Sequence, residues 1–302
     1  MNRDKAEGGT GKRVGWVEFR DSYWLLRRVV GFATLNSTLR NSATLVLSSV
    51  FGSIFFLSWF LMPAAGIAAT LPDTIDKVRP SVVGVGVVQK KIRRMESTFS
   101  GTGFVVGDGR IVVTNYHVYK GLEKARDQGA SLVVFTGRGK AAKARPVRLL
   151  RADKAHDLAL LQLQGGRLPA LRLAGDRLAR EGEAVAFTGF PIGMALGLIP
   201  ATHRGIISAI TPIALPASSV KALKAEQIRR IRGGPFLVYQ LDGTAYPGNS
   251  GSPVYRRDTG EVIGVINSVF IKGGKEAALA RPSGISYAIP IKHVRALLGQ
   301  TH

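Results

Sequence analysis

The feature that most restricts the fold of this chain is a long succession of short apolar runs after residue 71, each bounded by Gly, Pro or polar residues. Val- and Ile-rich runs of about 4–8 residues match β-strands and are too short for ordinary helices. The 36 glycines and 14 prolines supply turns between them. We therefore predict an all-β barrel or sandwich with strands near 81–88, 103–106, 110–114, 131–135, 157–163, 183–189, 202–210, 261–266 and 285–289.

A few segments are predicted to be helical. Residues 73–78 favour a short helical turn that ends at Pro80, and residues 290–300 carry apolar residues at helical spacing and predict a C-terminal helix. Residues 218–232 combine apolar and basic residues. This basic segment is either a solvated amphipathic helix or an insertion that regulates activity or contacts a substrate.

The N-terminal part differs from the rest. Residues 1–42 are polar and are expected to lack a fixed structure. Residues 43–69 hold no charged residue, and Leu45–Met62 is apolar and long enough to cross a bilayer. Arginines precede this stretch and small residues follow it, so an uncleaved transmembrane anchor and a cleaved signal peptide both fit. Either predicts that the remaining chain lies outside the cytoplasm, in the periplasm or secreted.

Charge and composition exclude several classes of function. The net charge is +22, and residues 70–302 hold 34 Lys and Arg against 16 Asp and Glu, which favours anionic surfaces as partners. The basic residues are dispersed without interleaved aromatic residues, so nucleic-acid binding is not expected. There is no cysteine, so neither disulfides nor thiolate chemistry is possible. The 5 histidines show no metal-ligand spacing, and we expect no metal and no cofactor.

The sharpest local motif is the segment 246–253, which reads Tyr-Pro-Gly-Asn-Ser-Gly-Ser-Pro. A nucleophilic serine needs an exposed Oγ on a tight turn, with backbone N–H groups directed at the developing oxyanion. Gly248 and Gly251 permit the unusual dihedrals of such a turn. Alone, the motif also fits an ordinary surface turn.

A base and an orienting carboxylate for Ser250 are present in the right order. His117 follows the apolar run 110–114, and Asp157 begins the apolar run 157–163. Each residue alone fits a structural role. The order His, Asp, Ser along the chain is that of chymotrypsin-like proteases, whereas α/β-hydrolases have the order Ser, Asp, His. Together the three residues predict a catalytic triad.

Several motifs in correct sequence carry a resemblance to a known family. The chain resembles the HtrA/Deg branch of the trypsin-like serine proteases from about Leu71 to Gly299. The resemblance implies a chymotrypsin-like fold of two antiparallel six-stranded β-barrels, over 72–180 and 181–302, with the active site between them. The matching segments are Gly101–Val106, Val113–Val118, His156–Leu161, Gly205–Ala209, Gln240–Gly251 and Ile263–Ser268.

The resemblance also implies roles for individual residues. His117 becomes the general base, Asp157 its orienting partner and Ser250 the nucleophile, with the N–H groups of Gly248 and Ser250 as the oxyanion hole. Thr244 would form the base of the substrate pocket. Since Thr244 is not acidic, we expect a preference for small or medium apolar residues before the cleaved bond. The pocket wall would consist of Asn267, Ser268 and Val269.

The implied function is a serine endopeptidase that acts through an acyl-enzyme in envelope protein quality control or regulated proteolysis. The alternative is a catalytically silent binding protein with the same fold. Protein or peptide substrates are the expected partners, with the membrane if the anchor is retained, and a homo-oligomer is common in this branch. The chain departs from the usual pattern of this family at two points. Ser252 stands where family members usually have a second glycine, and no PDZ domain is expected to control activity in cis.

Overall fold

The computed structural model describes residues 69–92, 94–193, 197–212, 236–268 and 284–299. Contacts divide the chain into two units, and all described residues belong to the second, Ile67–His302. The predicted leader 1–42 and the predicted basic helix 218–232 lie outside the described residues, as does nearly all of the apolar stretch 43–69. No helix within the described part of the chain has the length and apolar character needed to span a membrane.

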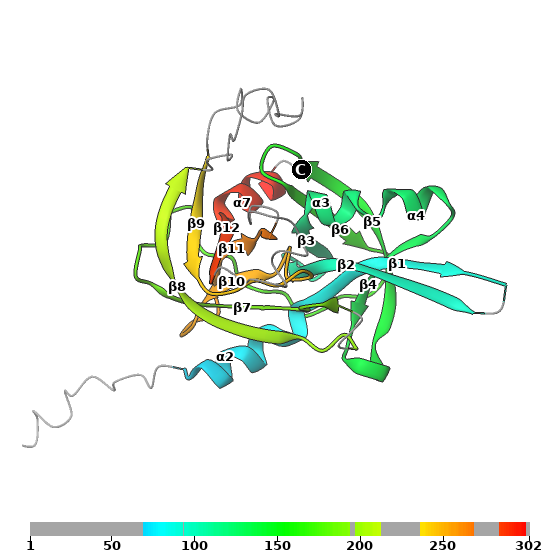
Figure 1. Ribbon diagram of the computed structural model, residues 1–302, viewed down its shortest axis with the longest axis horizontal. Coiled ribbons are helices and arrows are strands. Elements are labelled where there is room, and N and C mark those ends of the chain that lie inside the picture. The colour runs from blue at the N-terminus through cyan, green and yellow to red at the C-terminus, as the bar shows by residue number, and fades with distance from the viewer. Residues whose placement is uncertain (1–68, 93, 194–196, 213–235, 269–283, 300–302) are drawn as a thin grey trace, which may run out of the picture. The chain divides into compact units, whose positions relative to one another are not determined.

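The described chain forms two closed antiparallel six-stranded barrels, so the predicted barrel class is confirmed. Figure 1 shows them next to each other, the first in cyan and green, the second in green, yellow and red. Closure gives every strand a hydrogen-bonded neighbour on both sides. The first barrel comprises β1 (Val82–Lys90), β2 (Met95–Val106), β3 (Ile111–Asn115), β4 (Ser131–Thr136), β5 (Lys143–Asp153) and β6 (Leu158–Leu163).

The second barrel repeats the topology of the first. The strand order is β1-β2-β3-β6-β5-β4 in the first barrel, and the second, read from its first strand, runs β7-β8-β9-β12-β11-β10. Both barrels therefore bring the third and sixth strands together. The strands are β7 (Ala184–Gly189), β8 (Ala201–Pro212), β9 (Leu237–Asp242), β10 (Pro253–Arg256), β11 (Val262–Ile266) and β12 (Ile285–Pro290).

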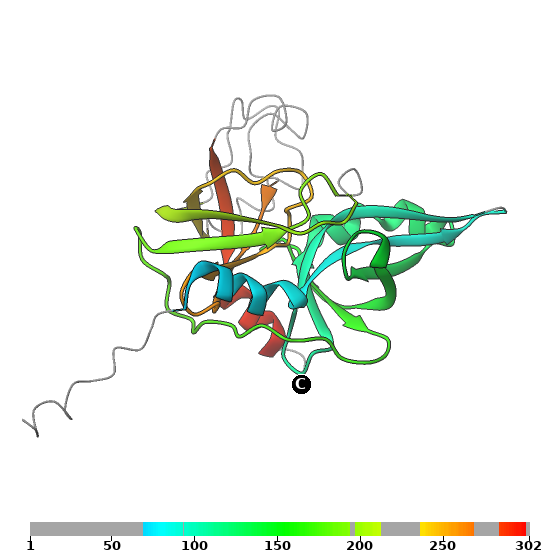
Figure 2. The same ribbon diagram turned by 90° about the horizontal axis from the view of Figure 1, so that it is seen from below.

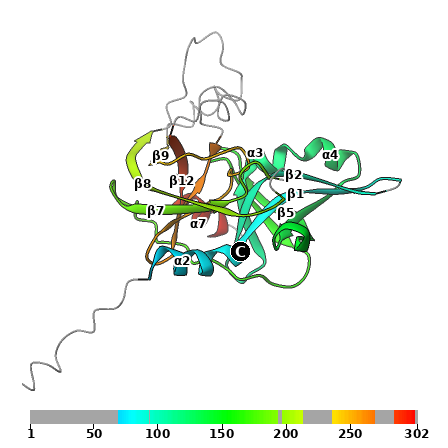
Figure 3. The same cartoon turned by 60° about the horizontal axis from the view of Figure 1, so that its bottom comes forward.

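Short helices join and flank the barrels. The predicted C-terminal helix is confirmed, and it buries Ile291, Val294 and Leu297. The helix that precedes the first barrel, α2, covers the β10–β11 turn, since Thr74 and Val78 lie against Gly260. Figure 2 and Figure 3 show α2 and the C-terminal helix α7 along the second barrel. The helices are α2 (Leu71–Val78), η1 (Arg79–Ser81), α3 (Tyr116–Lys120), α4 (Glu123–Asp127), η2 (Gly139–Ala141) and α7 (Ile291–Gly299).

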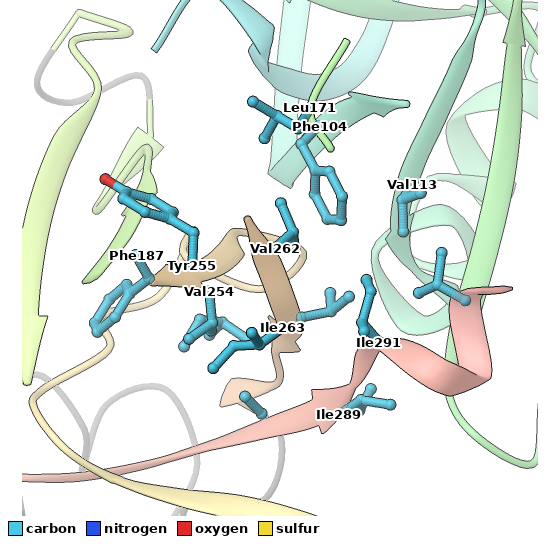
Figure 4. Packing of buried hydrophobic residues seen from close by; sticks show 14 of the residues in the cluster. Phe104, Val113, Leu171, Phe187, Val254, Tyr255, Val262, Ile263, Ile289 and Ile291 are labelled. Atoms are coloured by element: carbon cyan, nitrogen blue, oxygen red, sulfur yellow. The ribbon is translucent and has the colours of Figure 1, made fainter. Parts of the chain in front are cut away.

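One apolar core spans both barrels. In Figure 4, Phe104 and Val113 of the first barrel face Val262 and Ile291 of the second part of the chain, and all four side chains are at most 3% exposed. Burying such side chains stabilises each by about 1.5–3 kcal/mol relative to exposure. The same core therefore holds the two barrels at a fixed separation.

The connecting segment 164–183 also ties the barrels together through its backbone. Leu171 N–H donates to the carbonyl of Val105 at 2.9 Å, and Ala174 N–H donates to the carbonyl of Val262 at 2.9 Å. Parallel bridges at Leu171 and Leu173 accompany these bonds. Side chains from different barrels can thus be positioned accurately against one another.

Candidate active site

Strand pairing in the first barrel brings His117 and Asp157 together. His117 lies in α3 directly after β3, and Asp157 lies in the turn directly before β6. β3 and β6 are neighbours, with Asn115 opposite Leu158. His117 Nδ1 lies 2.6 Å from Asp157 Oδ2, and the backbone N–H of His117 donates to Asp157 Oδ1 at 2.8 Å. The carboxylate therefore fixes both the ring and the backbone of the histidine.

Asp157 is buried, at 2% exposure, and its polar atoms are matched by donors. Asn267 Nδ2 donates to Asp157 Oδ2 at 2.7 Å, which connects the second barrel to the pair. Tyr116 N–H donates to the carbonyl of Asp157 at 3.0 Å, and this residue adopts φ +53° in the left-handed region. A carboxylate held this way favours the histidine tautomer with Nδ1–H toward it and with Nε2 free to accept a proton.

Ser250 lies on a tight turn that both barrels hold in place. Gly248 has φ +99° and Gly251 has φ +88°, which a side chain would strain. Thr102 of β2 clamps the turn from the first barrel. Its N–H donates to the carbonyl of Ser250 at 2.8 Å, and its Oγ1 donates to the carbonyl of Gly248 at 2.7 Å.

The backbone N–H groups of this turn are used unequally. Asn249 N–H donates to the carbonyl of Tyr246 at 2.9 Å, and Gly251 N–H donates to the carbonyl of Ile266 at 3.0 Å. The N–H groups of Gly248 and Ser250, in contrast, donate to no residue in the described ranges. Two unused donors on either side of Asn249 are a suitable arrangement for binding an anionic oxygen.

The hydroxyl of Ser250 has a partner other than the histidine. Ser250 Oγ hydrogen-bonds to Ser268 Oγ, and within the described residues it makes no hydrogen bond to His117. Ser250 is 4% exposed. A hydrogen bond from Ser250 to His117 would therefore require the hydroxyl to rotate away from Ser268.

The residues predicted for the substrate pocket lie in three different settings. Thr244 is half-buried, Asn267 directs its amide to Asp157, and Ser268 contacts Ser250. Val269 lies outside the described residues. The pocket that these four residues are expected to form stays a prediction.

Ser286, which the sequence reasoning did not single out, supports the backbone around Thr244. Its Oγ donates to the carbonyl of Gly243 at 2.6 Å and accepts from Ala245 N–H at 2.7 Å. Ser286 is fully buried in β12. A serine inside the otherwise apolar run 285–289 was the one sequence signal that could have indicated this role.

The departure at Ser252 is accommodated by a glycine on a neighbouring strand. Ser252 is fully buried, and its Oγ has no hydrogen-bond partner among the described residues. A Cβ at Gly189 would lie 2.0 Å from this oxygen. Gly189 therefore provides the space that the larger residue requires.

A second aspartate–histidine pair lies beside Asp157. His156 Nδ1 is 2.6 Å from Asp153 Oδ2, and the His156 ring stacks on His293 of α7 with ring centroids 3.9 Å apart. Phe236 packs edge-on against both imidazoles. Burial, aided by repulsion from His156 and Lys292, lowers the pKa of His293 to about 4.

This shift predicts a loss of stability in acid. A histidine whose pKa falls on folding binds its proton more tightly in the unfolded chain than in the folded one. The folded protein therefore keeps its full free energy of unfolding above the unfolded pKa of 6.5, and loses part of it as the pH falls to about 4. Because His293 is partly exposed, we expect this pKa shift to change the free energy of unfolding by about 2 kcal/mol in total. His293→Phe, which keeps an aromatic ring but cannot titrate, should lose about 1.5 kcal/mol less than the wild type between pH 7 and pH 4.5 in urea unfolding.

Two observations bear on that experiment. His293 Nε2 has no hydrogen-bond partner among the described residues. The substitution His293→Phe therefore removes no hydrogen bond of this atom within the described structure. Burial also lowers the pKa of His203, so the variant should keep some acid sensitivity. Parallel pH profiles for the variant and the wild type would show that His293 is not responsible.

The fold and the site define a class. Two barrels of identical topology, a buried aspartate that hydrogen-bonds to a histidine, and a serine on a tight turn followed by a glycine are the arrangement of chymotrypsin-like proteins. In the residues that the structure describes, no cluster of three or more His, Asp or Glu could hold a metal.

Comparison with known proteins agrees with this class. Residues 101–265, more than half of the chain, match the trypsin-like peptidase domain family, and the chain belongs to that family. It is 28% identical to the serine protease HTRA1B of Danio rerio over 77% of this chain and 41% of that protein. A probable periplasmic serine endoprotease, DegP-like, of Halomonas elongata is 32% identical over 63% of this chain and 32% of its own length.

Solved structures show the same fold. The HtrA-type protease AlgW with a tripeptide aligns with a TM-score of 0.54 at 22% identity, over 77% of this chain and 63% of that one. A serine endoprotease of Yersinia pestis aligns with a TM-score of 0.52 at 22% identity, over 78% and 67%. The resemblance to HtrA and Deg proteins is thus confirmed. The chain spans less than half the length of the HTRA1B and DegP-like proteins it matches.

Proposed function

We propose that this protein is a serine endopeptidase that hydrolyses peptide bonds of proteins through an acyl-enzyme intermediate. The observation that carries the proposal is the pairing of buried Asp157 with His117, next to a serine turn with two N–H donors that have no partner among the described residues. Membership of the trypsin-like peptidase family supports it independently. No cofactor or metal is needed for this chemistry.

In the proposed reaction, His117 Nε2 removes the proton of Ser250 Oγ while the oxygen attacks the peptide carbonyl carbon. The N–H groups of Gly248 and Ser250 stabilise the oxyanion that forms. Asp157 stabilises the imidazolium, which then donates its proton to the leaving amine. Water repeats the sequence on the acyl-enzyme and releases Ser250.

The substrate preference is proposed from the residues around the turn. Thr244 would lie at the base of the pocket, with Asn267, Ser268 and Val269 along a wall. None of these side chains carries a negative charge, so nothing among them would select Lys or Arg. We expect cleavage after small or medium apolar residues.

The cellular setting is proposed from the sequence and from the names of relatives. The apolar stretch 43–69, retained as an anchor or removed as a signal, would export the peptidase, and the DegP-like relatives are described as periplasmic. We propose an extracytoplasmic location, a role in envelope protein quality control or regulated proteolysis, and assembly into a homo-oligomer. Nucleic acid is not a proposed partner.

A catalytically silent binding protein is the second candidate. Its support is the hydrogen bond of Ser250 Oγ to Ser268 in place of His117. A serine held in that position would be unreactive until a ligand or a conformational change released it. The two candidates differ in whether Ser250 reacts in the isolated protein.

Fluorophosphonate labelling of the purified full chain separates the two candidates. We expect the wild type to be labelled and Ser250→Ala to remain unlabelled, since the probe reacts only with an activated serine. Ser252→Ala is the matched control, because it removes a neighbouring buried hydroxyl and should leave labelling intact. Ser268→Ala should be labelled at least as fast as the wild type, since Ser250 loses its competing partner. If neither the wild type nor Ser268→Ala reacts, the peptidase proposal fails and the binding protein is favoured.

A further inference from the structure

The hairpin of β1 and β2 extends from the first barrel well beyond the other strands, as Figure 1 and Figure 2 show. β1 pairs with β4 only as far as Val88, opposite Ser131. Beyond that point β1 pairs with β2 alone, ending with Lys90 opposite Met95. Lys91 N–H donates to the carbonyl of Arg94 at 2.9 Å, one step beyond the last strand pair.

The end of this hairpin carries the most exposed large apolar side chains of the described residues. Ile92 is 104% exposed and Met95 is 62% exposed, whereas the next most exposed, Ile199, is at 55%. An isolated apolar residue on a surface needs no explanation, but two of them at one projecting end indicate a contact site. We call Lys90, Lys91, Ile92, Arg94 and Met95 the hairpin tip.

Exposed positive charge surrounds these two side chains. Lys90, Lys91 and Arg94 are all exposed, and none of them forms an ion pair with a carboxylate in the described part of the chain. Glu96 is the only acidic residue in the described sequence from Gln89 to Ser97. The hairpin tip therefore combines exposed apolar side chains with three cations that have no ionic partner among the described residues.

We propose that the hairpin tip binds the surface of an anionic lipid bilayer. Ile92 and Met95 would enter the boundary between headgroups and acyl chains, and the three cations would contact the phosphates. Basic residues next to exposed apolar side chains are the combination by which proteins bind membrane surfaces. The inference does not depend on the proposed peptidase activity.

A protein partner fits this surface less well. Stable protein interfaces bury about 800 Å² on each partner and involve roughly 20–30 residues a side. The hairpin tip offers five described side chains on a projecting end. A bilayer, in contrast, accepts a few apolar side chains without a complementary cavity, and its negative surface potential attracts each nearby cation.

The test uses a fluorophore that responds to its surroundings, attached at the hairpin tip of the full chain. The protein has no cysteine, so Ile92→Cys creates a single site for a nitrobenzoxadiazole label. The labelled chain is mixed with vesicles of phosphatidylcholine alone or with phosphatidylglycerol added. We expect the emission to rise and shift to shorter wavelength only with phosphatidylglycerol, and to weaken in high salt.

Two matched controls locate the response. The same label at Ile199→Cys, an exposed apolar position in the second barrel, should not respond. Replacing Lys90, Lys91 and Arg94 with glutamine in the Ile92→Cys protein should raise the lipid concentration for half response about 100-fold, since each cation near the surface contributes about 1 kcal/mol. The same neutralisation at Lys143, Arg177 and Arg204 should change it much less.

Other outcomes would overturn the proposal. A silent label at the hairpin tip while the chain sediments with the vesicles would mean that another segment binds the lipid. Equal responses to both lipid mixtures, or from both label positions, would exclude specific recognition of an anionic surface by the hairpin tip. A response that depends on protein concentration without vesicles would indicate a contact between copies of the chain instead.

Discussion

Asp157→Asn is expected to lower kcat for casein hydrolysis by about 10⁴-fold and to slow fluorophosphonate labelling in parallel. An asparagine amide at this position would present N–H to His117 Nδ1, which would then have to be the unprotonated nitrogen. Nε2 would carry the proton and could not accept one from Ser250. The fold should tolerate the change, because asparagine has nearly the same size as aspartate.

The chain contains a matched control for this substitution. Asp153 contacts His156 with nearly the same geometry, at 2.6 Å from Oδ2 to Nδ1 and 3.0 Å from Oδ1 to the backbone N–H, yet it lies outside the proposed triad. Asp153→Asn should keep kcat within about tenfold of the wild type. If Asp157→Asn keeps comparable activity, or if both variants lose activity equally, the proposed role of Asp157 is refuted.

The sequence was informative about the barrels where strands are apolar on both faces. The runs that became β3 and β6 could be identified because nearly every residue in them is buried. β5 was missed because basic residues and Pro146 interrupt its apolar residues. β9 and β10 were missed as well, and β10 has only 4 residues, too few for a periodic pattern. Closed pairing in three dimensions, not local pattern, determines these three strands.

Helical segments around the site were likewise not predictable from local pattern. His117 was predicted only to follow the apolar run 110–114, and it lies in α3, a helix of 5 residues. Such a helix is too short to show apolar periodicity and depends on tertiary contacts for its stability. α4 is equally short and buries no residue fully.

The site residues could be proposed from order and motif, but not the groups that hold them. Thr102 bonds to Gly248, 146 residues away in sequence, and Asn267 bonds to Asp157 across 110 residues. Contacts over such separations depend on how the two barrels are placed against each other. No local signal in the sequence distinguishes an asparagine on a pocket wall from one that orients a carboxylate.

Gly251→Ala is expected to destabilise the folded protein by more than about 4 kcal/mol and to abolish fluorophosphonate labelling. Residue 251 has φ +88°, and a Cβ there would lie 2.0 Å from the carbonyl oxygen of Thr102 and 2.7 Å from Thr114 Oγ1. The Thr102 carbonyl cannot easily move away, because it accepts a hydrogen bond from Thr114 Oγ1 at 2.7 Å. Displacing Thr102 would also remove the clamp on the Ser250 turn.

Gly182→Ala separates the clash from the backbone strain. Gly182 has nearly the same dihedral, φ +84°, but a Cβ there meets no atom within 4 Å. This variant should therefore cost only the left-handed strain of about 1–2 kcal/mol and should keep full labelling. Urea unfolding of both variants measures the difference, which is the free energy of forcing the two barrels apart at the Ser250 turn. Equal destabilisation of the two variants would mean that β2 and the turn can separate easily, and that Thr102 does not hold Ser250 in place.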